Sequence, residues 1–224
     1  MHSNMRNHLR VPGLLALSGL IAVSGCFSLA RTEPVTRHYV LGGTSLGESA
    51  APSTALAGLS IGVRRLRLAP YLDPPFIAIR QEPHGIGFSE FNRWGEPLAG
   101  GINRAVSGYL TSSAAFRAVD VAPWPAREKY DYLIQLHVER FEGVAPADAT
   151  ASAGEVHMLA TWEVIDQQDG IVLARGTTEH REAGWELEDY PALVRSLDAG
   201  LITLSRDLLA AVESLATRTT STTP

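Results

Sequence analysis

The 224-residue chain contains a single cysteine, Cys26, which lies close to its N-terminus. One thiol cannot form an intramolecular disulfide, and it cannot supply a zinc site that is built from several thiolates. Stability must therefore come from an apolar core, for which a hydrophobic content of 45% is sufficient. The length suits one ordinary domain with a leader or a tail.

The segment before Cys26 has the layout of a secretory signal peptide. Arg6 and Arg10 carry the only fixed charges of the first 25 positions, and no charged residue occurs between positions 11 and 30. A membrane-spanning helix needs about 20 apolar residues, but glycine, serine and proline interrupt this stretch. An apolar run over 14–23 that is followed by small residues fits a cleaved signal peptide over 1–25 better.

The sequence Val23-Ser24-Gly25-Cys26 resembles a bacterial lipobox. This resemblance implies cleavage between Gly25 and Cys26, a diacylglyceryl group on the thiol and an acyl group on the new α-amine. Several acyl chains give a stable membrane anchor because each buried methylene contributes about 0.8 kcal/mol. A residue other than aspartate at position 27, here Phe27, resembles the enterobacterial signal for export to the outer membrane. The alternative is a buried apolar cysteine in an uncleaved leader.

Removal of residues 1–25 would make the chain more acidic. Loss of Arg6 and Arg10, with all 24 acidic residues kept, moves the net charge from −5 to −7. A negative body on a lipid anchor is not expected to lie flat on an anionic bilayer. An acidic chain is also not typical of nucleic-acid binders. We therefore expect membrane contact through the anchor, soluble proteins as partners, and no nucleic acid.

Behind the anchor, the chain divides into a tether over 26–36, one domain over 37–216 and a disordered tail over 217–224. Alternation of apolar and polar residues predicts strands at 37–41, 59–68, 76–80, 86–89, 117–121, 130–141, 156–165 and 171–180. Helical spacing of apolar residues predicts helices at 97–113 and 189–215, and residues 42–58 form a loop or insert. We predict a mixed α/β fold: a single domain with a mixed, largely antiparallel sheet packed by two main helices, the longer one C-terminal.

Motifs for catalysis or metal binding are weak, and we predict that the chain is not an enzyme. Residues 43–47 match G-x-S-x-G around Ser45, but that elbow requires a strand followed directly by a helix, which this sequence does not predict. An envelope esterase using Ser45 is the remaining enzymatic alternative. Three histidines on predicted strands lack ligand-type neighbours at short spacing, so no metal site is expected: His137, His157 and His180. No cofactor is expected beyond the lipid on Cys26.

Three stiff loops combine proline with aromatic residues and could contact a partner or a second copy. Tryptophan, tyrosine and arginine dominate the binding energy of protein interfaces. The candidate contact residues are Tyr71, Asp73, Phe91, Arg93, Trp94 and Trp124. The alternative is local packing, with Trp94 covering the start of a helix and Arg93 pairing with Glu96 or Glu90.

Four segments resemble the ABC-type transport auxiliary lipoprotein family, in the family's order. They are IGVRRLRLAPYLDPPFIAIR over 61–80, FNRWGEPL over 91–98, APWP over 122–125 and YDYLIQLHVERFEG over 130–143. With the lipobox, the resemblance covers about residues 23–215. The long insert at 42–58 departs from the family pattern.

This resemblance implies a non-enzymatic accessory subunit of an envelope system that moves lipid between the inner and outer membranes. Such a subunit would be anchored to the periplasmic face of the outer membrane and would dock on a Mce-domain protein. The symmetry of Mce rings makes a homo-oligomer plausible. The alternative is a structural lipoprotein of another envelope assembly complex.

Overall fold

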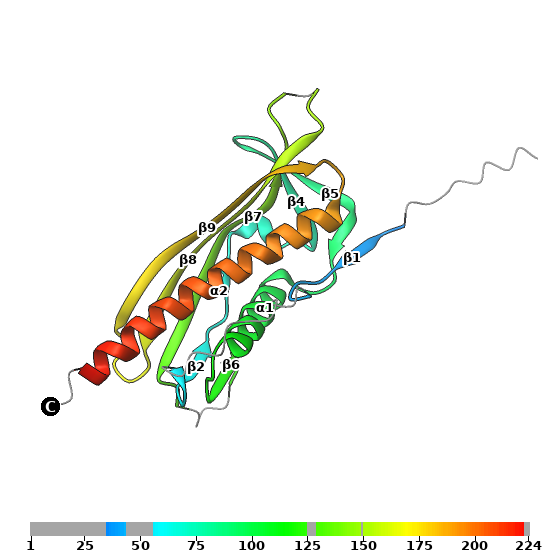
Figure 1. The fold of residues 1–224 in the computed structure, drawn as a ribbon. Coiled ribbons are helices and arrows are strands. Elements are labelled where there is room, and N and C mark those ends of the chain that lie inside the picture. Colours follow the sequence, from blue (N-terminus) through cyan, green and yellow to red (C-terminus); the bar gives the residue numbers. More distant parts are fainter. Residues whose placement is uncertain (1–34, 44–55, 125–128, 149, 222–224) are drawn as a thin grey trace, which may run out of the picture. The chain divides into compact units, whose positions relative to one another are not determined.

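A computed structural model describes residues 35–43, 56–124, 129–148 and 150–221 (Figure 1). The predicted signal peptide, the lipid attachment residue Cys26, most of the tether and Ser45 lie outside these residues. The described part forms a mixed α/β domain with a nine-stranded sheet and two α-helices, the longer one C-terminal. The predicted fold class is therefore confirmed.

The sheet is organised around the long strand β7 (Tyr132–Val144). One edge of β7 pairs antiparallel with β8 (Ala153–Asp166), which pairs antiparallel with β9 (Val172–Glu186). The other edge of β7 pairs in parallel with three shorter strands in succession, β2 (Ser60–Val63), β3 (Arg67–Leu68) and β4 (Phe76–Glu82). Antiparallel pairing thus dominates among the longest strands.

Three further strands complete the sheet on the side of the short strands. β5 (Gly85–Trp94) forms an antiparallel hairpin with β4, and β1 (Arg37–Tyr39) pairs in parallel with β5. β6 (Ala118–Val121) pairs in parallel with β2. The predicted Asp-Gly turn between β8 and β9 is confirmed, because Gly170 adopts a φ of +67° that glycine tolerates best.

The prediction of one continuous strand over 59–68 is wrong. Val63 pairs with Ile134 and Arg67 pairs with His137. Arg67 is therefore four residues after Val63, whereas their partners on β7 are only three residues apart. The extra residue leaves the ladder, and the segment divides into β2 and β3. Strand β5 also runs on through Trp94, into residues that the sequence analysis assigned to a strand-to-helix junction.

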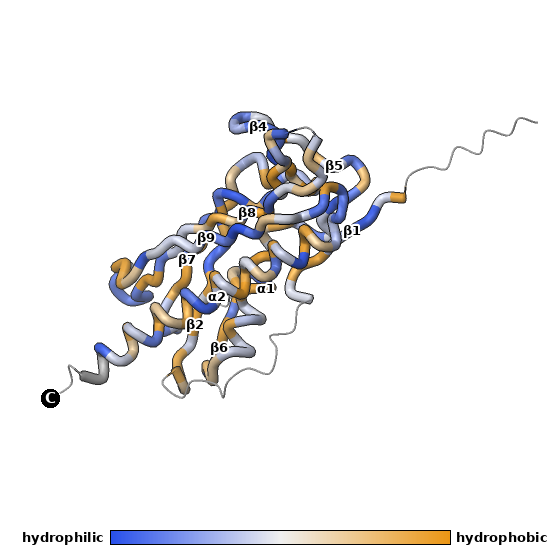
Figure 2. Tube along the Cα trace, turned by 45° about the horizontal axis from the view of Figure 1, so that its top comes forward, coloured by the Kyte–Doolittle hydropathy of each residue, from blue (hydrophilic) through white to orange (hydrophobic). Residues whose placement is uncertain are grey.

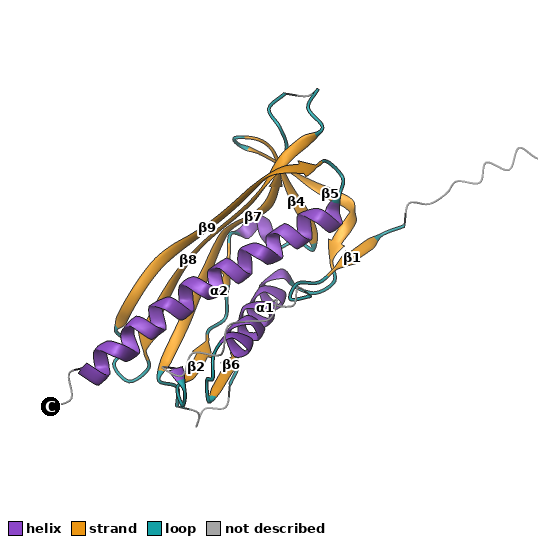
Figure 3. Cartoon of the chain, in the orientation of Figure 1, coloured by secondary structure: helices purple, strands orange, loops and turns teal. Residues whose placement is uncertain are grey.

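Both α-helices cover one face of the sheet, as Figure 3 shows. α1 (Leu98–Ser113) follows Pro97, which lacks an N–H group and suits a helix start. α2 (Tyr190–Ser221) packs on β8 and β9 and continues into residues predicted as a disordered tail. Figure 2 shows apolar residues at intervals along α2. The stripe has no exposed surface at its centre, at Leu193, Leu197, Leu201, Leu204 and Leu208. As expected for an amphipathic helix, it faces the core.

A buried carboxylate joins the two helices to the loop after β1. Asp198 of α2 is 3% exposed, accepts a hydrogen bond from the backbone N–H of Gly42 at 2.8 Å, and accepts another from the hydroxyl of Tyr109 at 2.7 Å. These bonds satisfy a charge that would otherwise be costly to bury. Within the described ranges, no helix is both long enough and apolar enough to cross a bilayer.

Candidate functional site

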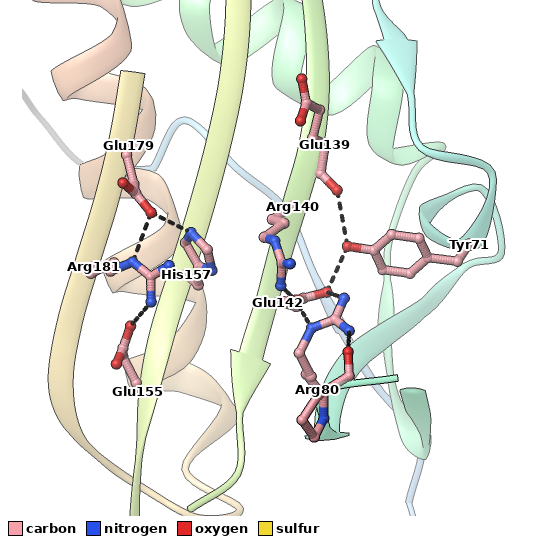
Figure 4. Close-up of polar contacts among 10 residues, drawn as sticks. Tyr71, Arg80, Glu139, Arg140, Glu142, Glu155, His157, Glu179 and Arg181 are labelled. Atoms are coloured by element: carbon pink, nitrogen blue, oxygen red, sulfur yellow. Dashed lines mark hydrogen bonds and ion pairs between the residues drawn. The ribbon is translucent and has the colours of Figure 1, made fainter. Parts of the chain in front are cut away.

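The face of β7, β8 and β9 opposite the helices, here called the outer face, carries the domain's main polar cluster. Side chains of directly paired residues lie on the same face of a sheet. The register pairs Glu142 with His157, and His157 with Arg181, across the three strands. Arg140 lies two residues before Glu142 on β7 and therefore shares its face, and a register shift after Val138 brings both onto the face that carries His137. Figure 4 shows these side chains with their partners.

Glu142 lies on the outer face and yet has no exposed surface. Arg80 of β4 covers it with a two-pronged contact, in which Nε donates to Oε1 at 2.6 Å and Nη2 donates to Oε2 at 3.3 Å. Arg140 adds a bond from Nη1 to Oε1 at 3.2 Å. A buried carboxylate is tolerated only when it is paired and hydrogen-bonded, and two guanidinium groups meet that requirement here.

Tyr71 completes the enclosure of Glu142. The 3₁₀ helix η2 (Pro70–Leu72) places its hydroxyl 2.6 Å from Oε2 of Glu142 and 3.1 Å from the carbonyl oxygen of Glu139. Burial, followed by the bond to Glu142, raises the pKa of the Tyr71 hydroxyl far above its usual value. The hydrogen bond to Glu142 also raises the pKa of Arg80. Tyr71 therefore remains a neutral donor and Arg80 a cation.

A second group of ions lies beside the first on β8 and β9. His157, 2% exposed, has its Nε2 2.9 Å from Oε1 of Glu179. Arg181 donates to Glu179 at 2.7 Å and to Glu155 at 2.9 Å. Burial lowers the pKa of His157, and the positive charge of Arg181 lowers it further, so the imidazole is neutral at pH 7.

We call these two groups the outer-face network. Its members are Tyr71, Arg80, Arg140, Glu142, Glu155, His157, Glu179 and Arg181. Each of its arginines contacts a carboxylate, so the charges are matched within the network. The first group joins η2 and β4 to β7, and the second joins β8 to β9, on the face that neither α-helix covers.

Chemistry by a metal or a nucleophile finds little support in the described residues. Among them, no three histidine, cysteine or acidic side chains are grouped closely enough to hold a metal ion. Between α2 and β9, Nε2 of His180 lies 3.3 Å from Oγ of Ser196, whose hydroxyl donates to Glu182. Glu182 approaches that same Nε2, at 3.7 Å, whereas a catalytic triad needs the acid on the other ring nitrogen.

The predicted contact residues do not form one surface. Trp94 is buried and packs on Phe141, with 5.7 Å between ring centroids, which matches the alternative of local packing. The Arg93 guanidinium lies 4.8 Å above the Phe76 ring and donates to the carbonyl of Glu90 rather than to its carboxylate.

The remaining candidates differ in exposure. Trp124 packs edge-on against Tyr130, with 5.3 Å between ring centroids. Asp73 is exposed and Phe91 is 41% exposed. Glu142 and Arg80 were not predicted as site residues, since Arg80 ends one predicted strand and Glu142 follows another.

Comparison with known proteins identifies the family. The model of the family described as "ABC-type transport auxiliary lipoprotein component" matches residues 39–208, more than half of the chain. The chain belongs to this family. The match spans every strand from the end of β1 onward and most of α2. It makes this chain a lipoprotein component that is auxiliary to ABC-type transport.

Solved structures similar to this auxiliary lipoprotein support the fold. Protein XCC0632 from Xanthomonas campestris is 19% identical with a TM-score of 0.61, and the match covers 85% of this chain and 98% of that one. A structure described only as an uncharacterized protein is 15% identical, also with a TM-score of 0.61, over 80% of this chain and 99% of that one. No curated protein matches the chain in sequence.

Proposed function

We propose that this auxiliary lipoprotein is a non-enzymatic subunit of a Mce-type system that transports lipid between the two envelope membranes. The family match over residues 39–208 carries the proposal. The family description supplies the role in transport. The Mce-domain partner is our proposal, and it rests on the resemblance of the sequence motifs. The core around the helices and the matched ion pairs of the outer-face network suit an adaptor better than a catalyst.

The proposed anchor is the lipid on Cys26, at the periplasmic face of the outer membrane. Cys26→Ala is expected to release a folded protein that no longer fractionates with membranes. Phe27→Asp is the matched control, since it keeps the lipid but carries the residue associated with retention in the inner membrane of an enterobacterial host. Unchanged membrane fractionation of Cys26→Ala would refute the anchor, and an unchanged location of Phe27→Asp would refute the sorting argument.

The proposed partner is a Mce-domain protein, bound by a homo-oligomer of this chain. Crosslinking in membranes followed by pull-down is expected to recover a Mce-domain protein with the wild-type lipoprotein, and to recover much less with Cys26→Ala. Native mass spectrometry of the purified protein measures the oligomer. Recovery of components of another envelope assembly, without a Mce-domain protein, would instead favour a structural lipoprotein of that assembly.

A further inference from the structure

A second feature of the outer face is a cleft of about 350 Å³ that lies beyond the outer-face network, toward the β8–β9 turn. Strands β3, β7, β8 and β9 all contribute to it. Its polar lining comes mainly from Arg67, Gln135, His137, Thr161, Glu163 and Arg175. The volume lies within the range of small-molecule sites, roughly 300–1,000 Å³.

The strand register explains why these side chains meet. Arg67 pairs with His137, which pairs with Thr161, which in turn pairs with Thr177. These four residues form one row across four strands. The adjacent row is Gln135, Glu163 and Arg175, again paired directly. The two rows place two guanidinium groups, one imidazole and two threonine hydroxyls around one hollow.

The arginines of the cleft differ from those of the outer-face network. Arg80, Arg140 and Arg181 each contact a carboxylate. Within the described residues, neither Arg67 nor Arg175 has a hydrogen bond or an ion pair from its guanidinium group. Both side chains are exposed on a chain whose net charge is −5. A local excess of unmatched positive charge on an acidic protein suits an anionic ligand.

The donors favour phosphate among the possible anions. A planar guanidinium group donates two parallel N–H bonds that match a phosphate group, and hydroxyl and imidazole donors can satisfy its other oxygens. Glu163 is the one carboxylate among the cleft residues that the structure describes, and its charge opposes an anion. We propose that this cleft binds a phosphate-bearing anion, either the phosphodiester head group of a lipid or free phosphate.

The proposal rests on the cleft alone and stands whether or not the Mce partner is found. The test is isothermal titration calorimetry of the full chain in a neutral detergent. The two probes are inorganic phosphate and glycerophosphoglycerol, which is the deacylated head group of phosphatidylglycerol. Saturable binding of at least one probe is expected, and the probe that binds more tightly identifies the source of the phosphate.

Four variants make the test specific. Arg67→Gln and Arg175→Gln are each expected to weaken binding by about tenfold, since each removes hydrogen bonds to a charged ligand. Glu163→Gln is expected to tighten binding, because it removes the opposing charge. Arg195→Gln, which removes an exposed charge from α2, is the control and should leave the dissociation constant unchanged.

Two outcomes would overturn the proposal. One is that neither probe binds the wild-type chain. The other is binding that is equally strong in Arg67→Gln, Arg175→Gln and Arg195→Gln, which would show non-specific attraction. Circular dichroism confirms that each variant is folded. Because Glu163→Gln moves affinity in the opposite direction, loss of folding in an arginine variant would not remove the test.

Discussion

Replacement of Glu142 by alanine tests whether the outer-face network holds the sheet together. The substitution leaves Arg80, whose side chain is only 15% exposed, without its carboxylate partner, and it also removes the nearer of the two acceptors of the Tyr71 hydroxyl. Removing one partner of a buried ion pair costs about 3–5 kcal/mol, because the other charge stays buried and unpaired. We expect the free energy of unfolding of Glu142→Ala to fall by about that amount.

Two smaller substitutions in the outer-face network separate the contributions to this loss of stability. Tyr71→Phe removes the hydroxyl that bonds the Glu142 carboxylate and the Glu139 carbonyl, and it should cost about 1.5–3 kcal/mol. Glu155→Ala is the matched control, since it removes a glutamate from the same face that pairs with Arg181. Both side chains of that pair reach solvent, with exposed fractions of 34% for Glu155 and 54% for Arg181, so the expected loss is about 0.2–1 kcal/mol.

The assay is urea denaturation followed by tryptophan fluorescence, with circular dichroism as a second probe. Coincident transitions from the two probes justify a two-state fit. The reasoning is refuted if Glu142→Ala and Glu155→Ala lose the same small amount of stability. That result would mean that water reaches Arg80 and Tyr71 in the variant, and that the enclosure of Glu142 contributes little to the fold.

Three further predictions concern other buried polar and glycine positions. Asp198→Asn replaces an acceptor of two bonds by an amide and should cost about 1–3 kcal/mol in the same assay, whereas no loss would show that Tyr109 finds another acceptor. His157, whose folded-state pKa lies below its ordinary 6.5, binds a proton more readily in the unfolded chain. Stability should therefore fall as the pH drops from 6.5 to 5, by at most about 1.4 kcal/mol per pH unit, and His157→Gln should flatten that dependence in denaturation curves at several pH values. Gly176→Val places a Cβ 2.3 Å from the Trp162 ring and should lower the melting temperature, with Gly108→Val in α1 as the comparison for a glycine that has open space around it.

The periodicity of apolar residues predicted the long helix α2 and the long strand β7 well, because each buries apolar side chains along most of its length. The stripe of leucines in α2 and the alternation along β7 each have one apolar face, which is what such patterns report. The short parallel strands were harder to predict, since β2 and β3 together cover six residues and their division depends on a register set by β7. Parallel pairing itself depends on strands far apart in sequence, and local alternation does not report it.

The site was less predictable than the fold, for a related physical reason. Aromatic residues in proline-rich loops resemble interface residues, but Trp94 lies in the core against Phe141. Glu142 lies just after the predicted strand 130–141, and only the contacts of Arg80 and Tyr71 from other elements show that it is buried. Burial of a charged side chain is set by long-range contacts, and a sequence pattern cannot show them.

The motifs that carry the family resemblance converge on one short stretch of β7. On its inner side, Phe141 packs on Trp94 from the second motif. On its outer side, Glu142 binds Tyr71 from the first motif. A side chain at the next residue, Gly143, would lie 2.6 Å from the Trp185 ring, so only glycine fits there. These motif residues explain why the chain adopts this fold. Substitutions of Trp94, Phe141 or Glu142 would therefore test the stability of the fold, whereas the arginine variants of the cleft leave these contacts in place and test ligand binding.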